Sequence, residues 1–394
     1  MQMAKLSEPF DVLDFVLNQG NGVKGLSDTR LKTVPNQFIQ PIEDRIHVAP
    51  LTSCDSSSSS SIPIIDVSNW DNDDPKVSES ICEAAEKFGF FQIINHGVPL
   101  EVLENVMEAG HRFFGLPVEE RRKYIFNGKN NTNTSVQLKT SFTPHKEKVL
   151  EWKDYLTHIY CNGDNGSVED EDDPKGSDSW PSVSRDQLLE YMKWAKPVIK
   201  RLLKVLMKGL NVEEIDATKE NLLMGTLIVN FNHYPICPNP DLTAGVGPHS
   251  DVSTITILLQ DDTGGLYVRG REGWIHVTPV KGALMVNVGD VLQIMSNDRY
   301  KSIEHRAVTS ARKHRISVPI FVNPVSLMKG SRLLNMLKFD IILLSIALLQ
   351  ALFHLGLPGL GLLVIKAPFC FSFCFALSEY YGNREAFMEV DVEF

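Results

Sequence analysis

The chain has 394 residues, 43% of them hydrophobic, so it can bury a sizeable core. Its formal net charge is −10 and it has no long basic block, which argues against a nucleic-acid-binding protein. The six cysteines are scattered without a CxxC pair and favour reduced thiols in an intracellular protein, and the charged N-terminus has no apolar run typical of a signal peptide.

The first half of the chain predicts a lead-in followed by a mixed domain. Residues 1–61 are expected to be a polar, partly helical lead-in with a Ser-rich linker, and residues 62–180 an N-terminal domain of helices and strands. Apolar runs predict strands, and helical spacing predicts helices, in the order 62–66, 79–88, 90–94, 100–114 and 117–123. We expect residues 127–143 to be irregular and the acidic residues 162–179 to form a solvated loop.

The second half predicts helices and then a β-rich core. Connecting helices are expected over residues 181–225, and one long helix runs from 184 to 210. From residue 226 the pattern changes to short strands between glycine turns, at 227–231, 254–260, 266–268, 274–277, 283–288, 305–308 and 316–322. This pattern predicts an α+β fold with a double-stranded β-helix (jelly-roll) core over residues 226–324.

Two histidines and one carboxylate lie in this β-rich region, at His249, Asp251 and His305. His249 and Asp251 are two residues apart, so on one strand their side chains share a face and can reach one ion. His305 begins a later predicted strand, which a small barrel can bring to the same point. Each residue alone is more often structural, but their joint occurrence predicts a facial triad for Fe(II) with open coordination positions.

A second polar group follows the last histidine of this set. Arg315 and Ser317 are two residues apart, so on a strand their side chains share a face. Arginine can hold a carboxylate by a two-point fork, and serine adds a hydroxyl donor. Asn232 and Tyr234 alternate likewise and can complete the pocket, although Arg315 also fits a solvated basic cluster. Iron beside a captured carboxylate suggests oxygen activation driven by a 2-oxo acid, with no catalytic residue beyond the metal site.

These motifs resemble the plant 2-oxoglutarate/Fe(II)-dependent dioxygenase family. The resemblance covers roughly residues 10–324 and is carried, besides the triad, by residues 89–99, 232–242, 303–308 and 315–321. It implies that Fe(II) is bound by His249, Asp251 and His305. It also implies that 2-oxoglutarate is bound by Tyr234, Arg315, Ser317 and Asn232. O2 would be the other co-substrate, succinate and CO2 the by-products, and ascorbate the reductant.

Within the family the chain is most similar to feruloyl-CoA ortho-hydroxylases, through residues 20–27, 150–156 and 247–253. This likeness implies ring hydroxylation of a hydroxycinnamoyl-CoA, feruloyl-CoA first and p-coumaroyl-CoA second, beside the propenoyl chain. Lactone closure would then give scopoletin or umbelliferone, in the coumarin branch of phenylpropanoid metabolism. The alternatives are another plant 2-oxoglutarate oxygenase, such as a flavonoid or hormone oxidase, and a catalytically impaired, membrane-associated remnant.

Residues 325–394 depart from the family pattern and form an atypical hydrophobic tail. The stretch 341–365 carries no formal charge and is long enough to span a bilayer. A mistranslated or intron-derived tail, a buried replacement helix and a membrane anchor are the three interpretations. Because the usual C-terminal helix over the active site is missing, we expect reduced turnover of CoA esters. We further expect a cytoplasmic monomer that binds a small-molecule substrate and no nucleic acid, and that meets a membrane only through this tail.

Overall fold

Strands supply the core of the protein. The structure, a computed structural model, describes residues 11–45, 61–70, 74–125, 135–142, 144, 146–161, 176–212 and 214–324. The strands are β1 (Ile64–Asp66), β2 (Phe90–Ile94), β3 (Val136–Thr140), β4 (Asp154–Cys161), β5 (Thr226–Tyr234), β6 (Val246–His249), β7 (Ile255–Gln260), β8 (Leu266–Arg269), β9 (Trp274–His276), β10 (Leu284–Val288), β11 (His305–Ala307) and β12 (Arg315–Asn323). The α-helices are α1 (Gly22–Asp28), α2 (Pro75–Lys87), α3 (Leu100–Gly115), α4 (Val118–Arg122), α5 (Arg185–Gly209), α6 (Ala217–Met224) and α7 (Asp290–Met295).

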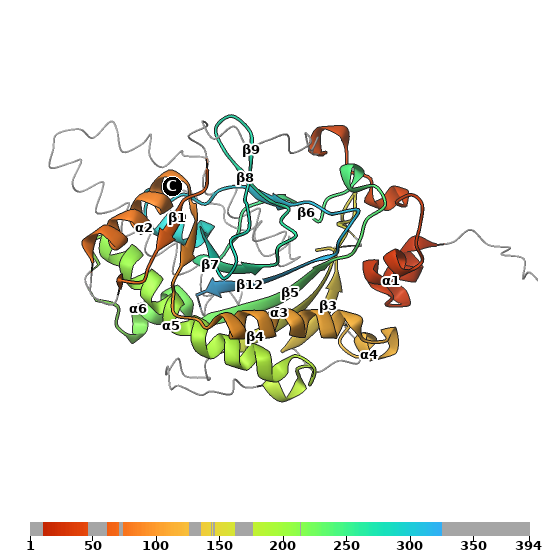
Figure 1. The fold of residues 1–394 in the computed structure, drawn as a ribbon, viewed down its shortest axis with the longest axis horizontal. Helices are drawn as coiled ribbons and strands as arrows, with labels where there is room; N and C mark the ends of the chain where they lie inside the picture. Colours follow the sequence, from red (N-terminus) through yellow and green to blue (C-terminus); the bar gives the residue numbers. More distant parts are fainter. Residues whose placement is uncertain are drawn as a thin grey trace, which may run out of the picture. The chain divides into compact units, whose positions relative to one another are not determined.

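These strands form two sheets (Figure 1). The larger sheet has eight strands in the order β1-β2-β10-β7-β12-β5-β4-β3, and the smaller has four in the order β6-β11-β8-β9. Among the named strands only β1 and β2 pair in parallel. The predicted jelly-roll core of an α+β fold is therefore confirmed. Strands from residues 62–180 and from residues 226–324 share the larger sheet, and the predicted domain boundaries stay predictions.

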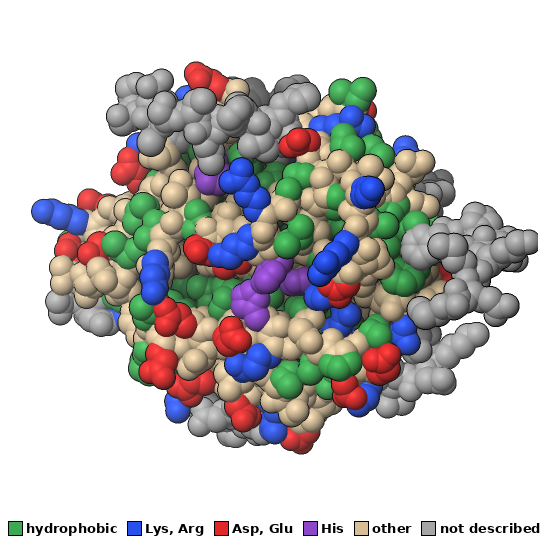
Figure 2. All heavy atoms as spheres, turned by 45° about the vertical axis from the view of Figure 1, so that its right-hand side comes forward, with side chains coloured by type: hydrophobic (Ala, Val, Ile, Leu, Met, Phe, Trp, Pro, Cys, Tyr) green, Lys and Arg blue, Asp and Glu red, His purple; other side chains and the backbone are tan. Residues whose placement is uncertain are grey.

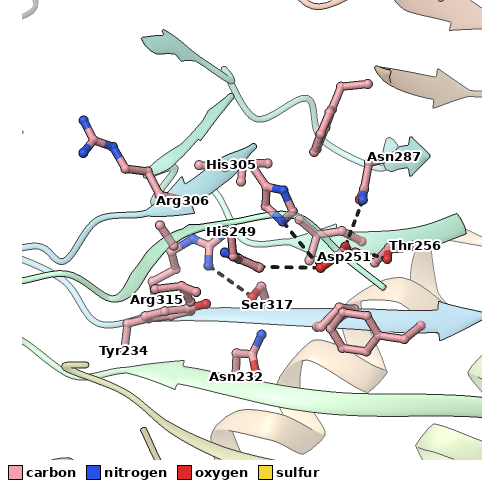
Figure 3. Close-up of a pocket in the computed structure, with 17 residues that line it drawn as sticks. Asn232, Tyr234, His249, Asp251, Thr256, Asn287, His305, Arg306, Arg315 and Ser317 are labelled. Atoms are coloured by element: carbon pink, nitrogen blue, oxygen red, sulfur yellow. Dashed lines mark hydrogen bonds and ion pairs between the residues drawn. The ribbon is translucent and has the colours of Figure 1, made fainter. Parts of the chain in front are cut away.

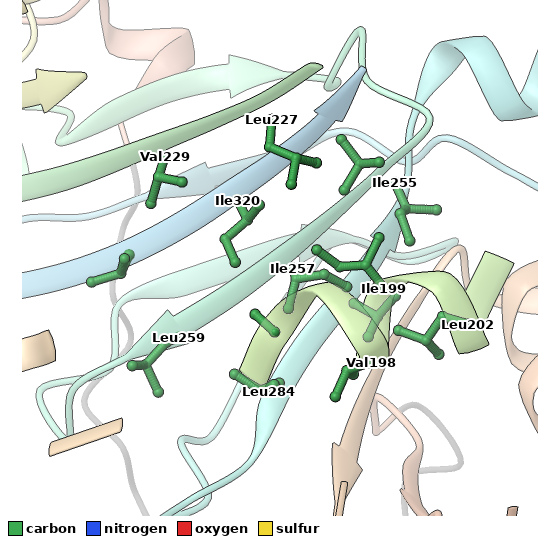
Figure 4. Packing of buried hydrophobic residues seen from close by; sticks show 14 of the residues in the cluster. Val198, Ile199, Leu202, Leu227, Val229, Ile255, Ile257, Leu259, Leu284 and Ile320 are labelled. Carbon is green, nitrogen blue, oxygen red and sulfur yellow. The ribbon is translucent and has the colours of Figure 1, made fainter. Parts of the chain in front are cut away.

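One face of the larger sheet is buried under helices, with α3 and α5 lying along it (Figure 1). Burial along β5 alternates accordingly: Val229 and Phe231 are fully buried, whereas Asn230 and Asn232 are half-buried on the other face. Aliphatic side chains fill the helix-covered face (Figure 4), among them Val198, Ile199, Leu202, Ile255, Ile257, Leu284 and Ile320. The opposite, inner face is left for the site.

Several predicted elements match, and three do not. β2 has the predicted bounds, and α2 starts earlier because Asp74 caps it by accepting a hydrogen bond from the Lys76 amide. The expectation of irregular structure over residues 127–143 is wrong, since β3 lies within it and pairs with β4, a strand that was not predicted. The helix α7, which begins at Asp290, was not predicted either.

A smaller core joins the N-terminal lead-in to the sheet. Buried residues of the lead-in pack against Trp152 and against Cys237, which is fully buried. The amides at the start of α1 donate to the Asp154 carboxylate, from Val23 at 2.9 Å and from Lys24 at 2.7 Å. This close approach of the α1 backbone to Asp154 needs glycine at position 22. The φ of Gly22 is +69°, and a Cβ there would lie 2.7 Å from the Asp154 carboxylate oxygens.

The apolar stretch 341–365, the rest of residues 325–394, the run 55–60 and residues 162–175 of the acidic loop lie outside the described residues. Predictions made for them stay predictions. No helix in the described part of the chain is both long enough and apolar enough to cross a bilayer.

Candidate metal and co-substrate site

One cavity on the inner face gathers the seven residues predicted for iron and co-substrate binding (Figure 3): Asn232, Tyr234, His249, Asp251, His305, Arg315 and Ser317. They come from β5, β6, β11 and β12 and from the turn after β6. The space-filling view of one face shows histidine side chains reaching the surface in a hollow, with Lys and Arg side chains on several sides (Figure 2).

The three predicted metal ligands converge in this cavity. One ligand atom of each lies within 4.8 Å of the others, and Asp251 Oδ1 is 3.6 Å from His249 Nε2 and 3.7 Å from His305 Nε2. The prediction that His249 and Asp251 share one strand is wrong, because β6 ends at His249. Asp251 lies in the following turn, where its carbonyl accepts a hydrogen bond from the Asp290 amide at 2.8 Å.

The Asp251 carboxylate is held from behind. Its Oδ2 accepts hydrogen bonds from Thr256 Oγ1 at 2.6 Å and from Asn287 Nδ2 at 2.9 Å, which leaves Oδ1 for the histidines (Figure 3). Burial raises the pKa of Asp251, but the facing His305 and His249 and these hydrogen bonds together outweigh it and hold the pKa below its ordinary value. The carboxylate is therefore ionised, as metal binding requires.

Each histidine is oriented by its other ring nitrogen. His249 Nδ1 lies 2.9 Å from the Gly247 carbonyl oxygen, and His305 Nδ1 lies 3.2 Å from the Ile303 carbonyl oxygen. Because a carbonyl only accepts, Nδ1 is the protonated nitrogen in both rings and Nε2 keeps its lone pair. Burial is the largest cause that lowers the pKa of His305, and the neighbouring His249 is the second. Together they bring this pKa to about 4, so the ring is neutral at neutral pH.

The co-substrate corner is built around a buried guanidinium. Arg315 is 3% exposed and donates to Ser317 Oγ and to Gln260 Oε1, each at 3.1 Å. Its guanidinium also lies 4.9 Å from the centre of the Tyr234 ring, while its Nε has no hydrogen-bond partner. Among the described residues no carboxylate pairs with Arg315, so a buried cation is left without a counterion.

These features fit the predicted ligands. Two imidazole nitrogens and one carboxylate oxygen are the donor set that suits Fe(II) and leaves positions open. A buried guanidinium without a counterion suits an anionic co-substrate, since buried charges are paired in stable proteins. The sheet register keeps this corner together, because Arg315 pairs with Tyr234 and Ser317 with Asn232 across β12 and β5.

Sequence reasoning missed the residues that support the predicted ones. Thr256 and Gln260 lie on β7, which was predicted as a strand, so their shared face was available as a signal. Asn287 lies within a predicted strand but offered no signal, because only the fold brings it to Asp251. The apolar lining was missed too: Phe90, Leu258, Leu266, Pro319 and Phe321.

The chain matches two sequence families along its length. Residues 225–324 match the 2OG-Fe(II) oxygenase superfamily, and residues 62–183 match the N-terminal region described as non-haem dioxygenase in morphine synthesis. All seven site residues fall within the first match.

Curated relatives and solved structures agree with these matches. The chain is 56% identical over 316 residues to a feruloyl CoA ortho-hydroxylase of Ipomoea batatas, which covers 80% of this chain and 83% of that protein. It is 56% identical over 317 residues to a bi-functional coumaroyl CoA and feruloyl CoA ortho-hydroxylase of the same plant (80% and 83% covered). A feruloyl CoA ortho-hydroxylase of Arabidopsis thaliana is 52% identical over 322 residues (81% and 84% covered). The crystal structure of JOX2 in complex with 2OG, Fe and JA is similar with a TM-score of 0.63 at 32% identity, covering 77% of this chain and 82% of that one.

Proposed function

Because the chain belongs to the 2OG-Fe(II) oxygenase superfamily, we propose that it hydroxylates the aromatic ring of a hydroxycinnamoyl-CoA thioester, feruloyl-CoA first and p-coumaroyl-CoA second. One observation carries the proposal: a His-Asp-His set and the buried guanidinium of Arg315, which has no carboxylate partner among the described residues, line one cavity. The substrate class comes from relatives that share more than half of the aligned residues with this chain.

Each group in the cavity has a proposed role. His249, Asp251 and His305 hold Fe(II), and Thr256 and Asn287 fix the carboxylate that points to it. The far carboxylate of 2-oxoglutarate is held by the side chains Arg315, Ser317, Tyr234 and Asn232. Bound iron and 2-oxoglutarate supply the oxidising equivalents from O2, and the protein supplies geometry.

The rest of the lining suits an aromatic ring. Phe90, Leu258 and Leu266 line the cavity together with Pro319 and Phe321, so part of the lining is apolar and can contact the substrate ring. Lys and Arg side chains around the hollow of Figure 2 suit the phosphates of a CoA thioester that reaches out of the cavity.

The proposed reaction balances without a further reductant. Feruloyl-CoA, 2-oxoglutarate and O2 give ring-hydroxylated feruloyl-CoA, succinate and CO2. One atom of O2 enters the new hydroxyl and the other enters succinate. Once the propenoyl double bond has isomerised from trans to cis, the new hydroxyl can attack the thioester carbonyl, which closes a lactone and releases the CoA thiol.

The test is turnover by the full chain. The protein is loaded with Fe(II) without oxygen, mixed with 2-oxoglutarate and feruloyl-CoA, exposed to air and analysed by mass spectrometry. We expect a product heavier by one oxygen atom and an equal amount of succinate, at a reduced rate if the tail interferes. Succinate formation stimulated by free acids but by no CoA thioester would refute the substrate class.

A flavonoid or a plant hormone is the second candidate substrate, and the similar JOX2 structure contains a compound other than a CoA thioester, JA, together with 2OG and Fe. A panel of free hydroxycinnamic acids, flavonoids and hormone acids separates the two. We also propose that the protein is a monomer and acts in the cytoplasm. Size-exclusion chromatography and cell fractionation test these two points, and sedimentation with membranes would contradict the second.

A further inference from the structure

The segment 150–156, which carries part of the family likeness, lies against the strand that bears His249. The Trp152 amide donates to the Ala244 carbonyl at 2.8 Å, and its indole Nε1 donates to the Pro235 carbonyl at 3.2 Å. These bonds fix the segment on the chain that leads into β6. The neighbouring Glu151 and Lys153 side chains have no role in the site described above.

Glu151 reaches β6 directly. Its Oε1 accepts a hydrogen bond from the Gly247 amide at 2.8 Å, while its Oε2 forms an ion pair with Lys153 Nζ at 2.8 Å. Both side chains are largely buried, with 16% of Glu151 and 10% of Lys153 exposed. Burial alone would lower the pKa of Lys153, but the facing Glu151 outweighs it and raises the pKa above its ordinary value. Lys153 therefore carries a positive charge at neutral pH.

β6 needs such support because of its place in the sheet. It is an edge strand of the smaller sheet, and its pairing with β11 shifts register between His305 and Ala307. The ladder therefore fixes β6 from one side only, and a backbone amide on the other side needs another acceptor. Among the three predicted metal ligands, His249 is also the most exposed, at 38% of its side chain against 11% for His305 and 5% for Asp251.

We propose that Glu151, neutralised by Lys153, is a positioning residue for His249. The contacts form a continuous path: Lys153 holds Glu151, Glu151 binds the Gly247 amide, and the Gly247 carbonyl accepts from His249 Nδ1. This path fixes the position of β6 and the tautomer of the His249 ring, so that His249 Nε2 faces Asp251. Partners that orient a metal-binding histidine in this way typically contribute about 10- to 100-fold to metal affinity.

The inference rests on the proposed function, and the test uses metal affinity rather than turnover. Two double variants of the full chain are compared, Glu151→Gln with Lys153→Met and Glu151→Met with Lys153→Met. Both remove the buried ion pair, and such replacements are often tolerated. Only the first keeps an acceptor for the Gly247 amide, so the comparison isolates that hydrogen bond.

Titration with Co(II) gives the decisive result. We expect the Gln/Met chain to bind Co(II) within about threefold of the wild-type chain, and the Met/Met chain to bind about 10-fold more weakly or worse. Melting curves show whether both variants are folded. A purely structural ion pair predicts equal Co(II) affinities for the two folded variants, and that result would overturn the inference.

The remaining outcomes are also decisive. If the Met/Met chain does not fold, the Gly247 amide of the wild-type chain is measured by hydrogen exchange. Protection supports the bond to Glu151, and exchange at the rate of an open edge strand overturns it. A wild-type chain that binds no Co(II) would refute the proposed metal site and this inference together, whereas normal wild-type binding with equal variants would refute the inference alone.

Discussion

Replacing Arg315 with methionine tests the co-substrate corner most sharply. The guanidinium is 3% exposed, donates to Ser317 and Gln260, and has no carboxylate partner among the residues described. If 2-oxoglutarate supplies that partner, Arg315→Met removes one half of a buried, hydrogen-bonded pair. Such losses amount to about 3–5 kcal/mol. At 1.4 kcal/mol per factor of ten, this is a loss of 2-oxoglutarate affinity of about 100- to 3,000-fold.

The same reasoning predicts that Arg315→Met does not destabilise the fold when no ligand is bound. The variant no longer buries an unpaired charge, so its free energy of unfolding should be unchanged or higher than that of the wild-type chain. Anaerobic calorimetric titration of the Fe(II)-loaded chains with 2-oxoglutarate measures the first effect, and urea unfolding without ligand measures the second. Iron affinity should stay within about threefold, because the hydrogen bonds of Arg315 in the described structure go to Ser317 and Gln260 and not to the three ligands.

Lys313 supplies the control for this experiment. It lies two residues from Arg315 and pairs with Asp262 at the surface, where 52% of the Lys313 side chain and 84% of the Asp262 side chain are exposed. Lys313→Met also removes one positive charge, yet it should leave 2-oxoglutarate affinity unchanged. Equal affinity in the Arg315→Met and wild-type chains would move the co-substrate elsewhere and refute the reasoning.

Three further changes have expected outcomes. Asp251→Ala should abolish Fe(II) binding in an anaerobic titration, because two histidines alone hold the ion poorly, and retained stoichiometric binding would contradict this. Thr256→Val removes a 2.6 Å hydrogen bond to the Asp251 carboxylate, worth about 1.5–3 kcal/mol, and should weaken Fe(II) binding about 10-fold or more, whereas Ser253→Ala, one contact further away, should have a smaller effect. Burial lowers the pKa of His158 to about 3, below its unfolded value of about 6.5, so stability present above pH 6.5 is lost as the pH falls towards 3. This amounts to about 2 kcal/mol by pH 5 and should shrink in His158→Gln, as urea unfolding at pH 7.5 and 5 can measure.

The residues of the site were predictable where chemistry and spacing are both restrictive. Arg315 and Ser317 alternate on β12 as expected, and the register places them beside Tyr234 and Asn232. The pair His249 and Asp251 was expected together because alternate residues of a strand share a face, but Asp251 lies beyond the strand. Its place is set by Thr256 and Asn287 instead, and Asn287, a partner 36 residues away, leaves no periodic trace in the sequence.

The missed strands have a physical reason of their own. β4 is buried on both faces for most of its length, so it lacks the alternation that marks a half-buried strand. Polar residues such as Asp154 and His158 are buried within it because the fold supplies their partners, from α1 for the carboxylate and from the Val229 carbonyl for the imidazole. By contrast, β2 is a short apolar run between glycine and asparagine turns, and its bounds were predicted correctly.

Because α1 binds Asp154 of β4, the lead-in acts as an intramolecular binding partner of the larger sheet. Residues 11–45 lie before the first family match at residue 62, yet they supply the Val23 and Lys24 amides to a carboxylate that is 1% exposed. While the chain is intact, the lead-in is present at the effective concentration of a covalently linked partner. A chain trimmed to its matched families would lose this partner, and a separate peptide of residues 11–45 would have to replace it by mass action.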